Sequence, residues 1–219
     1  MVPIISIVGR SKSGKTTLIE RLLPELIRRG YRVATIKHTH EPFEIDCAGK
    51  DSQRHKEAGA HTVIISSPYK VALIEDAPQD LSLDELAVRF VREADIIIAE
   101  GFKGDKHPKV EVFRRAVHSH PLASELENMI AIMSDESLQM DIPCLDVNDT
   151  NGAADIIEEH VIATQGKGDT TLVVNGKAIP LAAFAKSIIS ARIQGMLSSL
   201  KGCENPKEIE IRIQVGEEK

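Results

Sequence analysis

The sequence predicts an α/β fold of the P-loop type: a mainly parallel sheet with helices on both faces, followed by a small C-terminal appendage. Short, continuously apolar and β-branched runs such as residues 4–8 are typical of strands buried on both faces. Strand and helix patterns alternate along residues 1–165, which favours parallel βαβ units. After residue 165 the pattern changes to a hairpin, a helix and a last strand.

The first domain is expected to span residues 1–165. Its predicted strands are residues 4–8, 32–36, 62–66, 71–74, 96–99, 110–113, 129–133 and 143–147. Its predicted helices are residues 16–30, 51–59, 82–92 and 152–163. Strands 71–74 and 110–113 follow no long helix, so we interpret them as antiparallel additions to the sheet.

The second domain is expected to span residues 166–219. Asn175-Gly176 between two short apolar runs indicates a tight hairpin turn, because both residues tolerate positive φ angles. A helix with a wide apolar stripe follows, and alternating isoleucines at residues 209–213 predict a last strand. About fifty residues alone have a small core. We therefore expect this segment to dock, on the first domain in the simplest case, or else on a second subunit or a partner enzyme.

Composition and charge argue against several classes of protein. The formal charge is −6, and no basic stripe interleaved with aromatic residues is present, so we expect no nucleic-acid binding. No apolar run approaches the roughly 20 residues of a membrane span, and no secretory signal pattern opens the chain. Three widely spaced cysteines fit no disulfide or metal framework. We expect a cytoplasmic protein with reduced cysteines and no membrane contact.

Residues 9–16 match the spacing G-x-x-x-x-G-K-[ST] in full and lie between a strand pattern and a helix pattern. Glycines let backbone amides turn toward an anion, and the helix adds free N–H groups and the positive end of its dipole. In such a loop Lys15 places its charge on the β- and γ-phosphates, and the Thr16 hydroxyl ligates Mg²⁺. This phosphate loop predicts a nucleotide site with Lys15 as a catalytic cation. Its expected members are Gly9, Arg10, Ser11, Lys12, Ser13, Gly14, Lys15, Thr16 and Thr17.

Two cations of the loop have more than one interpretation. Arg10 precedes Lys15 by five residues, where some dimeric P-loop proteins are similar in placing a lysine that reaches across the interface. Lys12 would then be a second phosphate clamp. We favour the simpler interpretation, in which both are solvated loop cations.

Carboxylates for a magnesium site are expected at two places. Glu100 follows the apolar strand 96–99, at the carboxyl end where parallel sheets bind ligands, and is the expected metal residue beside Thr16. The polar loop 38–50 is longer than usual and is a candidate functional loop. Asp46 and Asp51 could reach the γ-phosphate or Mg²⁺ and act in catalysis. For Asp51, capping of the helix 51–59 is an equally good explanation.

Together these residues resemble the molybdopterin-guanine dinucleotide biosynthesis protein B (MobB) family. The segments that carry the resemblance are residues 9–17, 36–40, 46–60 and 99–112, and it covers about residues 1–165. The resemblance implies a dimeric protein that binds GTP with Mg²⁺, hydrolyses it slowly at most, and assists a partner, MobA, that transfers GMP to molybdopterin. Molybdopterin itself is a possible ligand. Residues 166–219 extend beyond the short form of the family and inherit nothing from the resemblance.

The usual guanine-reading pattern N-K-x-D is missing from the sequence. Asp135 follows the strand 129–133 at the corresponding place in the fold, so it is the expected acceptor for guanine N1 and N2, with loop capping an equal alternative.

Two other functions compete. A small-molecule kinase or ATP-dependent ligase of the dethiobiotin synthetase type is similar in ending a strand with Glu-Gly. A metallochaperone GTPase would need a Cys/His cluster near the phosphate loop, and the sequence lacks one.

Overall fold

The computed structural model of the chain describes residues 2–43, 49–163, 170–197, 200–203, 206 and 209–213. It forms two compact units, residues 1–166 and residues 167–219. Each unit is described by itself.

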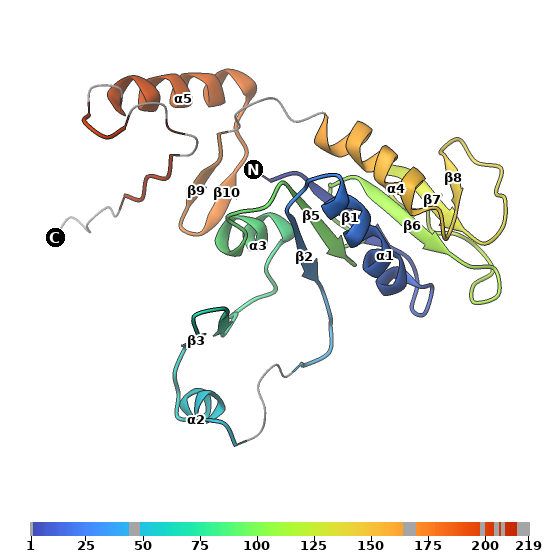
Figure 1. The fold of residues 1–219 in the computed structure, drawn as a ribbon, viewed down its shortest axis with the longest axis horizontal. Coiled ribbons are helices and arrows are strands. Elements are labelled where there is room, and N and C mark those ends of the chain that lie inside the picture. The colour runs from blue at the N-terminus through green and yellow to red at the C-terminus, as the bar shows by residue number, and fades with distance from the viewer. Residues whose placement is uncertain are drawn as a thin grey trace. The chain divides into compact units, whose positions relative to one another are not determined.

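The first unit is built on a six-stranded sheet in the order β2-β5-β1-β6-β7-β8 (Figure 1). Every neighbouring pair of strands in this sheet is parallel. The α/β class with a mainly parallel sheet is therefore confirmed. The strands are β1 Ile4–Val8, β2 Val33–Lys37, β5 Ile96–Glu100, β6 Lys109–Phe113, β7 Met129–Ser134 and β8 Cys144–Asp146.

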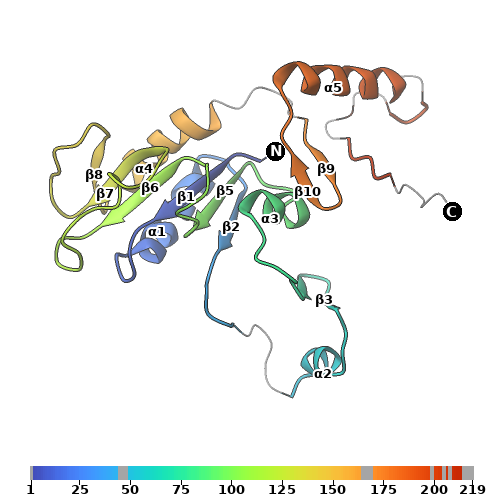
Figure 2. The same ribbon diagram turned by 180° about the vertical axis from the view of Figure 1, so that it is seen from behind.

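Helices cover both faces of the sheet (Figures 1 and 2). On one face, α1 Lys15–Arg28 and α4 Thr150–Ile157, which continues as the π-helical turn η1 Glu158–Ile162, pack on Ile5 and Ile7. On the other face, α3 Leu83–Phe90 packs on Ile4. Because neighbouring residues of β1 point to opposite faces, both of which are covered, the whole strand is buried and reads as an unbroken apolar run.

Strand β6 corrects one sequence prediction. Residues 110–113 were expected as an antiparallel addition, but β6 lies parallel to both β1 and β7. Residues 101–108 make the crossover from β5 without a helix. The buried Lys109 fixes this segment, because its ammonium donates to the carbonyl oxygens of Asp105, His107 and Glu127.

The segment between β2 and α3 contains α2 Asp51–Glu57 and an antiparallel hairpin of β3 Thr62–Ser66 and β4 Val71–Glu75. Residues 71–74 are thus antiparallel as predicted, but the prediction that they add to the main sheet is wrong, because β4 pairs with β3 in a separate two-stranded sheet. The helix begins with Asp51 in its first turn and Lys50 as its N-cap residue, so the capping role considered for Asp51 is wrong by one position. An acidic side chain in the first turn still complements the helix dipole.

The second unit contains the expected hairpin, β9 Leu172–Val174 and β10 Lys177–Ile179, followed by α5 Ala183–Leu197. Asn175 and Gly176 form the turn with φ angles of 50° and 78°. The predicted last strand at residues 209–213 is not formed. An alternating sequence becomes a strand only when a neighbouring strand accepts its hydrogen bonds, and no described strand does so here. Within the described residues, no helix has the length and apolar character needed to cross a membrane.

Candidate functional site

The phosphate loop connects β1 directly to α1 at the carboxyl edge of the sheet. Gly9, Lys12 and Gly14 have φ angles of 145°, 63° and 101°, so the chain turns tightly before the helix begins at Lys15. A Cβ atom on Gly9 would lie 2.6 Å from both the Ser13 Oγ and the Val112 carbonyl oxygen. Only glycine fits at this position, and the loop consequently lies close against β6.

Lys15 extends back over the loop that precedes it. Its Nζ donates to the carbonyl oxygens of Gly9 at 3.2 Å and Arg10 at 2.9 Å. Burial lowers the pKa of the Lys15 ammonium, while the nearby Glu100 carboxylate raises it. The side chain therefore holds its donors at the centre of the loop, where a phosphate would replace the two carbonyl oxygens as the acceptor.

Thr16 and Glu100 meet at the β5 side of the loop. Parallel pairing places Glu100 beside Ile7 of β1, and the Thr16 hydroxyl donates to the Glu100 carboxylate at 3.1 and 3.2 Å. Lys37, at the end of β2, lies 3.4 Å from the same carboxylate. A hydroxyl and a carboxylate side by side form the oxygen-rich pair that suits Mg²⁺. The structure thus brings together the two residues expected at the metal.

The loop that follows β6 covers the opposite side of the phosphate loop. Glu111 is buried, and its carboxylate accepts the backbone N–H groups of Leu122 at 2.7 Å and Ala123 at 2.8 Å. Burial raises the pKa of Glu111, and these two hydrogen bonds act in the opposite direction. The His118 ring lies 2.8 Å from the Ser11 carbonyl oxygen. Residues 114–123 are therefore held against the phosphate loop by the sheet and by the loop itself.

The structure is compatible with both interpretations given above for Arg10 and Lys12. The Arg10 guanidinium lies 3.8 Å from the Glu125 carboxylate, and its side chain is 44% exposed. Lys12 lines the hollow over the loop together with Ser11, Gly14, Lys15, Thr16, Thr17 and Glu100. This hollow has a volume of about 390 Å³, which lies within the usual range of ligand pockets.

Two buried polar atoms at the loop lack hydrogen-bond partners. Across the part of the chain that the structure describes, the buried side-chain nitrogen and oxygen atoms without a partner are Ser13 Oγ and Arg114 Nε. Arg114 was not among the predicted site residues. In the sequence it is one of two adjacent arginines after a strand, and only the parallel placement of β6 beside β1 brings it to the loop. Unpaired buried donors at a phosphate loop fit an anionic ligand with many acceptor oxygens.

Asp135 and Asp51 make no described contact with the phosphate loop. Asp135 follows β7 and is exposed; its carboxylate accepts the backbone N–H of Arg115 at 3.4 Å. Asp51 pairs with Arg54 at 3.6 Å on α2 and makes no described contact with the phosphate loop. Asp46 lies outside the described residues.

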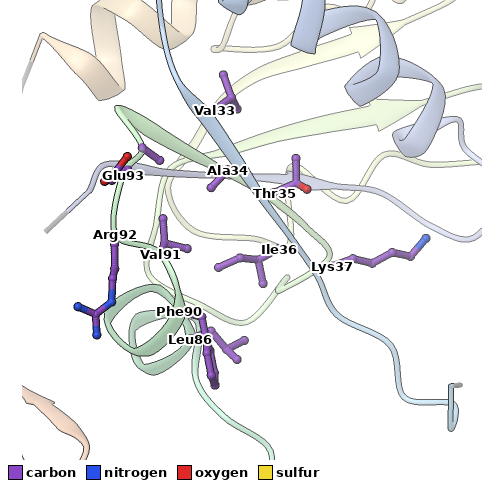
Figure 3. A pocket seen from close by; sticks show the side chains of 11 residues that line it. Val33, Ala34, Thr35, Ile36, Lys37, Leu86, Phe90, Val91, Arg92 and Glu93 are labelled. Carbon is purple, nitrogen blue, oxygen red and sulfur yellow. The ribbon is translucent and has the colours of Figure 1, made fainter. Parts of the chain in front are cut away.

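A larger hollow of about 550 Å³ lies between β2 and the end of α3 (Figure 3). Figure 3 shows Ile36 on the side of β2 that faces Leu86, Phe90 and Val91, whereas Lys37 extends away from them. This hollow lacks the glycine-rich turn and helix N-terminus of the phosphate loop. We therefore place the candidate functional site at the phosphate loop.

The described residues contain no group of three or more His, Cys, Asp or Glu side chains that could hold a metal ion by themselves. A metal at Thr16 and Glu100 would thus share its remaining positions with water and with phosphate oxygens, as Mg²⁺ commonly does.

Comparisons of this chain with known proteins all point to the same family. Residues 4–135 match the family model described as molybdopterin guanine dinucleotide synthesis protein B, MobB. A Haemophilus influenzae protein named molybdopterin-guanine dinucleotide biosynthesis adapter protein is 41% identical over 158 residues, which are 72% of this chain and 88% of that protein. A Methanocaldococcus jannaschii protein with the same name, marked putative there, is 27% identical over 97% of both chains, so its alignment includes the second unit.

Solved structures agree with this family. The crystal structure of Bacillus subtilis MobB superimposes with a TM-score of 0.58 at 27% identity, covering 73% of this chain and 98% of that one.

Proposed function

This chain belongs to the MobB family, and we propose that it is an adapter protein in the biosynthesis of molybdopterin guanine dinucleotide that binds GTP with Mg²⁺. The observation that carries the nucleotide part of the proposal is the pairing of the Thr16 hydroxyl with the Glu100 carboxylate beside the phosphate loop. The names of the relatives support the pathway.

Different residues of the site would bind different parts of the nucleotide. Backbone amides of the loop and the N-terminus of α1 would receive the β-phosphate, and the Lys15 ammonium would bind the β- and γ-phosphates. Thr16 and Glu100 would hold Mg²⁺, which supplies positive charge against the terminal phosphates. The unpaired Ser13 hydroxyl and Arg114 Nε are the donors that this ligand would satisfy.

Few groups at the site are placed to activate a water molecule. Asp51 is held on α2 beside Arg54, away from the phosphate loop, and Asp46 lies outside the described residues. Because the described residues at the phosphate loop include positioning groups but no assembled general base, we infer that hydrolysis is slow. A protein that binds GTP and turns it over slowly suits delivery or switching rather than rapid catalysis.

The proposed partner is a MobA-type guanylyltransferase, with the chain acting as a homodimer. The β3–β4 hairpin supports dimerisation, because Ile64, Tyr69 and Val71 are 63%, 96% and 67% exposed. A two-stranded hairpin with apolar side chains in water is marginally stable by itself. A second subunit over this hairpin would bury them.

The test is co-purification with a MobA-type partner, together with competition between GTP and ATP. We expect the partner to be retained and GTP to bind more tightly. An ATP preference with rapid turnover on a small acid or amine, and no retained partner, would instead indicate a small-molecule kinase or ATP-dependent ligase.

A further inference from the structure

Arg114 lies at the phosphate loop although it comes from a different strand. The register pairs Val8 of β1 with Glu111 of β6, so Arg114 follows β6 at the same edge at which the loop begins. Its Nε and Nη2 atoms lie 3.5 and 3.6 Å from the point that a Cβ on Gly14 would occupy. Gly14 is the N-cap residue of α1. The edge of the guanidinium that carries these two nitrogens is thus against the start of the helix.

One donor of Arg114 finds no acceptor in the described part of the chain. Its Nε is buried without a partner. The neighbouring Arg115 is different, because its guanidinium lies 2.7 Å from the Glu136 carboxylate. An arginine carries five N–H donors, and leaving such a donor both buried and unbonded is unfavourable. A ligand with acceptor atoms at the phosphate loop would remove this cost.

The order of the strands indicates which half of the ligand Arg114 meets. Glu100 ends β5 and Arg114 follows β6, and these two strands flank β1 on opposite sides. Thr16 and Glu100 mark the end of the site that holds Mg²⁺ and the terminal phosphates. The opposite side, toward β6 and β7, is left for the nucleoside. Asp135 also lies on this side, since its carboxylate accepts the N–H of Arg115.

We propose that Arg114 binds the nucleoside monophosphate half of the nucleotide, by donating paired hydrogen bonds to adjacent acceptor atoms; this inference rests on the proposed nucleotide site. Two parts of GTP offer such a pair: the oxygens of the α-phosphate, and the O6 and N7 atoms on the edge of guanine. Adenine presents an amino donor in place of O6, so contact with the base would also favour GTP over ATP.

The experiment measures equilibrium binding of GTP, 7-deaza-GTP and inorganic pyrophosphate, each with Mg²⁺, to the full chain. The variants are R114A, R114Q, the control R115A, and K15A. We expect R114A and R114Q to bind GTP roughly tenfold or more weakly, the effect of a lost charge-assisted hydrogen bond. Inorganic pyrophosphate, which lacks both the nucleoside and the α-phosphate, should bind them within about twofold of the wild type. R115A removes the same charge from a carboxylate-paired neighbour and should keep GTP affinity.

The 7-deaza ligand identifies the acceptor. If the contact is with guanine N7, wild type distinguishes GTP from 7-deaza-GTP and R114A does not. If the contact is with the α-phosphate, R114A weakens both ligands equally.

The proposal is overturned if R114A and R114Q bind GTP as the wild type does, if the binding of pyrophosphate weakens as much as that of GTP, or if R115A loses as much affinity as R114A. Failure of the nucleotide site itself is a separate result, in which neither wild type nor K15A binds any of the three ligands.

Discussion

Replacing Gly9 by alanine should destabilise the protein more than the same replacement at a glycine that also has a positive φ but has open space around it. A Cβ atom on Gly9 would lie 2.6 Å from the Val112 carbonyl oxygen and from Ser13 Oγ. The serine hydroxyl can rotate away, but the carbonyl belongs to β6, the strand paired with β1. Relief of the clash therefore requires β1 and β6 to move apart at the loop.

The expected cost has two parts. A φ of +145° is unfavourable for alanine, by about 1–3 kcal/mol, and forced overpacking adds about 1–3 kcal/mol. The sum, roughly 2–6 kcal/mol, corresponds to a fall in Tm of roughly 5–20 °C for a chain of this size.

Two control variants separate these parts in a thermal unfolding assay followed by circular dichroism. Gly30 has a φ of +96° and nothing within 4 Å of its added Cβ, so G30A carries only the conformational cost. Gly104 is open and has no positive φ, so G104A should unfold within about 0.5 kcal/mol of the wild type. The reasoning is refuted if G9A and G30A lower the Tm by the same amount, because the close approach of β6 would then have no effect.

Three further outcomes are expected. In E100Q the affinity for GTP in the presence of Mg²⁺ should fall about tenfold or more, while metal-free GTP binding persists. Titrations with and without EDTA measure the two affinities. An equal loss in both conditions would place Glu100 outside the metal site. In D135A the preference for GTP over ATP should fall in a competition assay, and an intact preference would exclude Asp135 as the guanine acceptor. The His107 ring and then Lys106 lower the pKa of Asp84 from 3.8 to about 2, so its carboxylate stabilises the fold above pH 4 and loses this effect as the pH falls through 2. In urea titrations, the free energy of unfolding of D84N should therefore lie about 2 kcal/mol below that of the wild type near neutral pH. The two free energies should become equal toward pH 2. A difference that is constant with pH would contradict this prediction.

Much of the first unit could be predicted from local sequence. Strands such as β1 and β5 are continuous β-branched runs because both of their faces are buried. The start of α3 follows from the Ser82 and Glu85 side chains, which form a capping box at its N-terminus. The phosphate loop depends on glycine conformations that its spacing already encodes.

Features that depend on distant contacts were not predictable in this way. The direction of β6 follows from a crossover held by the buried ammonium of Lys109, and a lysine at the start of a strand gives no local sign of this role. Arg114 reaches the phosphate loop only through strand pairing, whereas in the sequence it is indistinguishable from Arg115. Residues 209–213 alternate like a strand, but no described strand pairs with them.

The position of Asp51 differs by one residue from that of the helix cap considered for it. Its place beside Gly49 and Lys50 suggested either a cap or a catalytic carboxylate. The structure places it in the first turn of α2, paired with Arg54, and its catalytic role stays a prediction.

The most direct test of the central claim is the binding of Mg-GTP to the wild type and to K15A, measured by isothermal titration calorimetry. Lys15 supplies the charge at the centre of the loop, so K15A should lose at least tenfold in affinity, and more if several of its hydrogen bonds to phosphate are lost, with a Tm close to that of the wild type. A folded K15A protein that binds Mg-GTP as tightly as the wild type would contradict the account of this site.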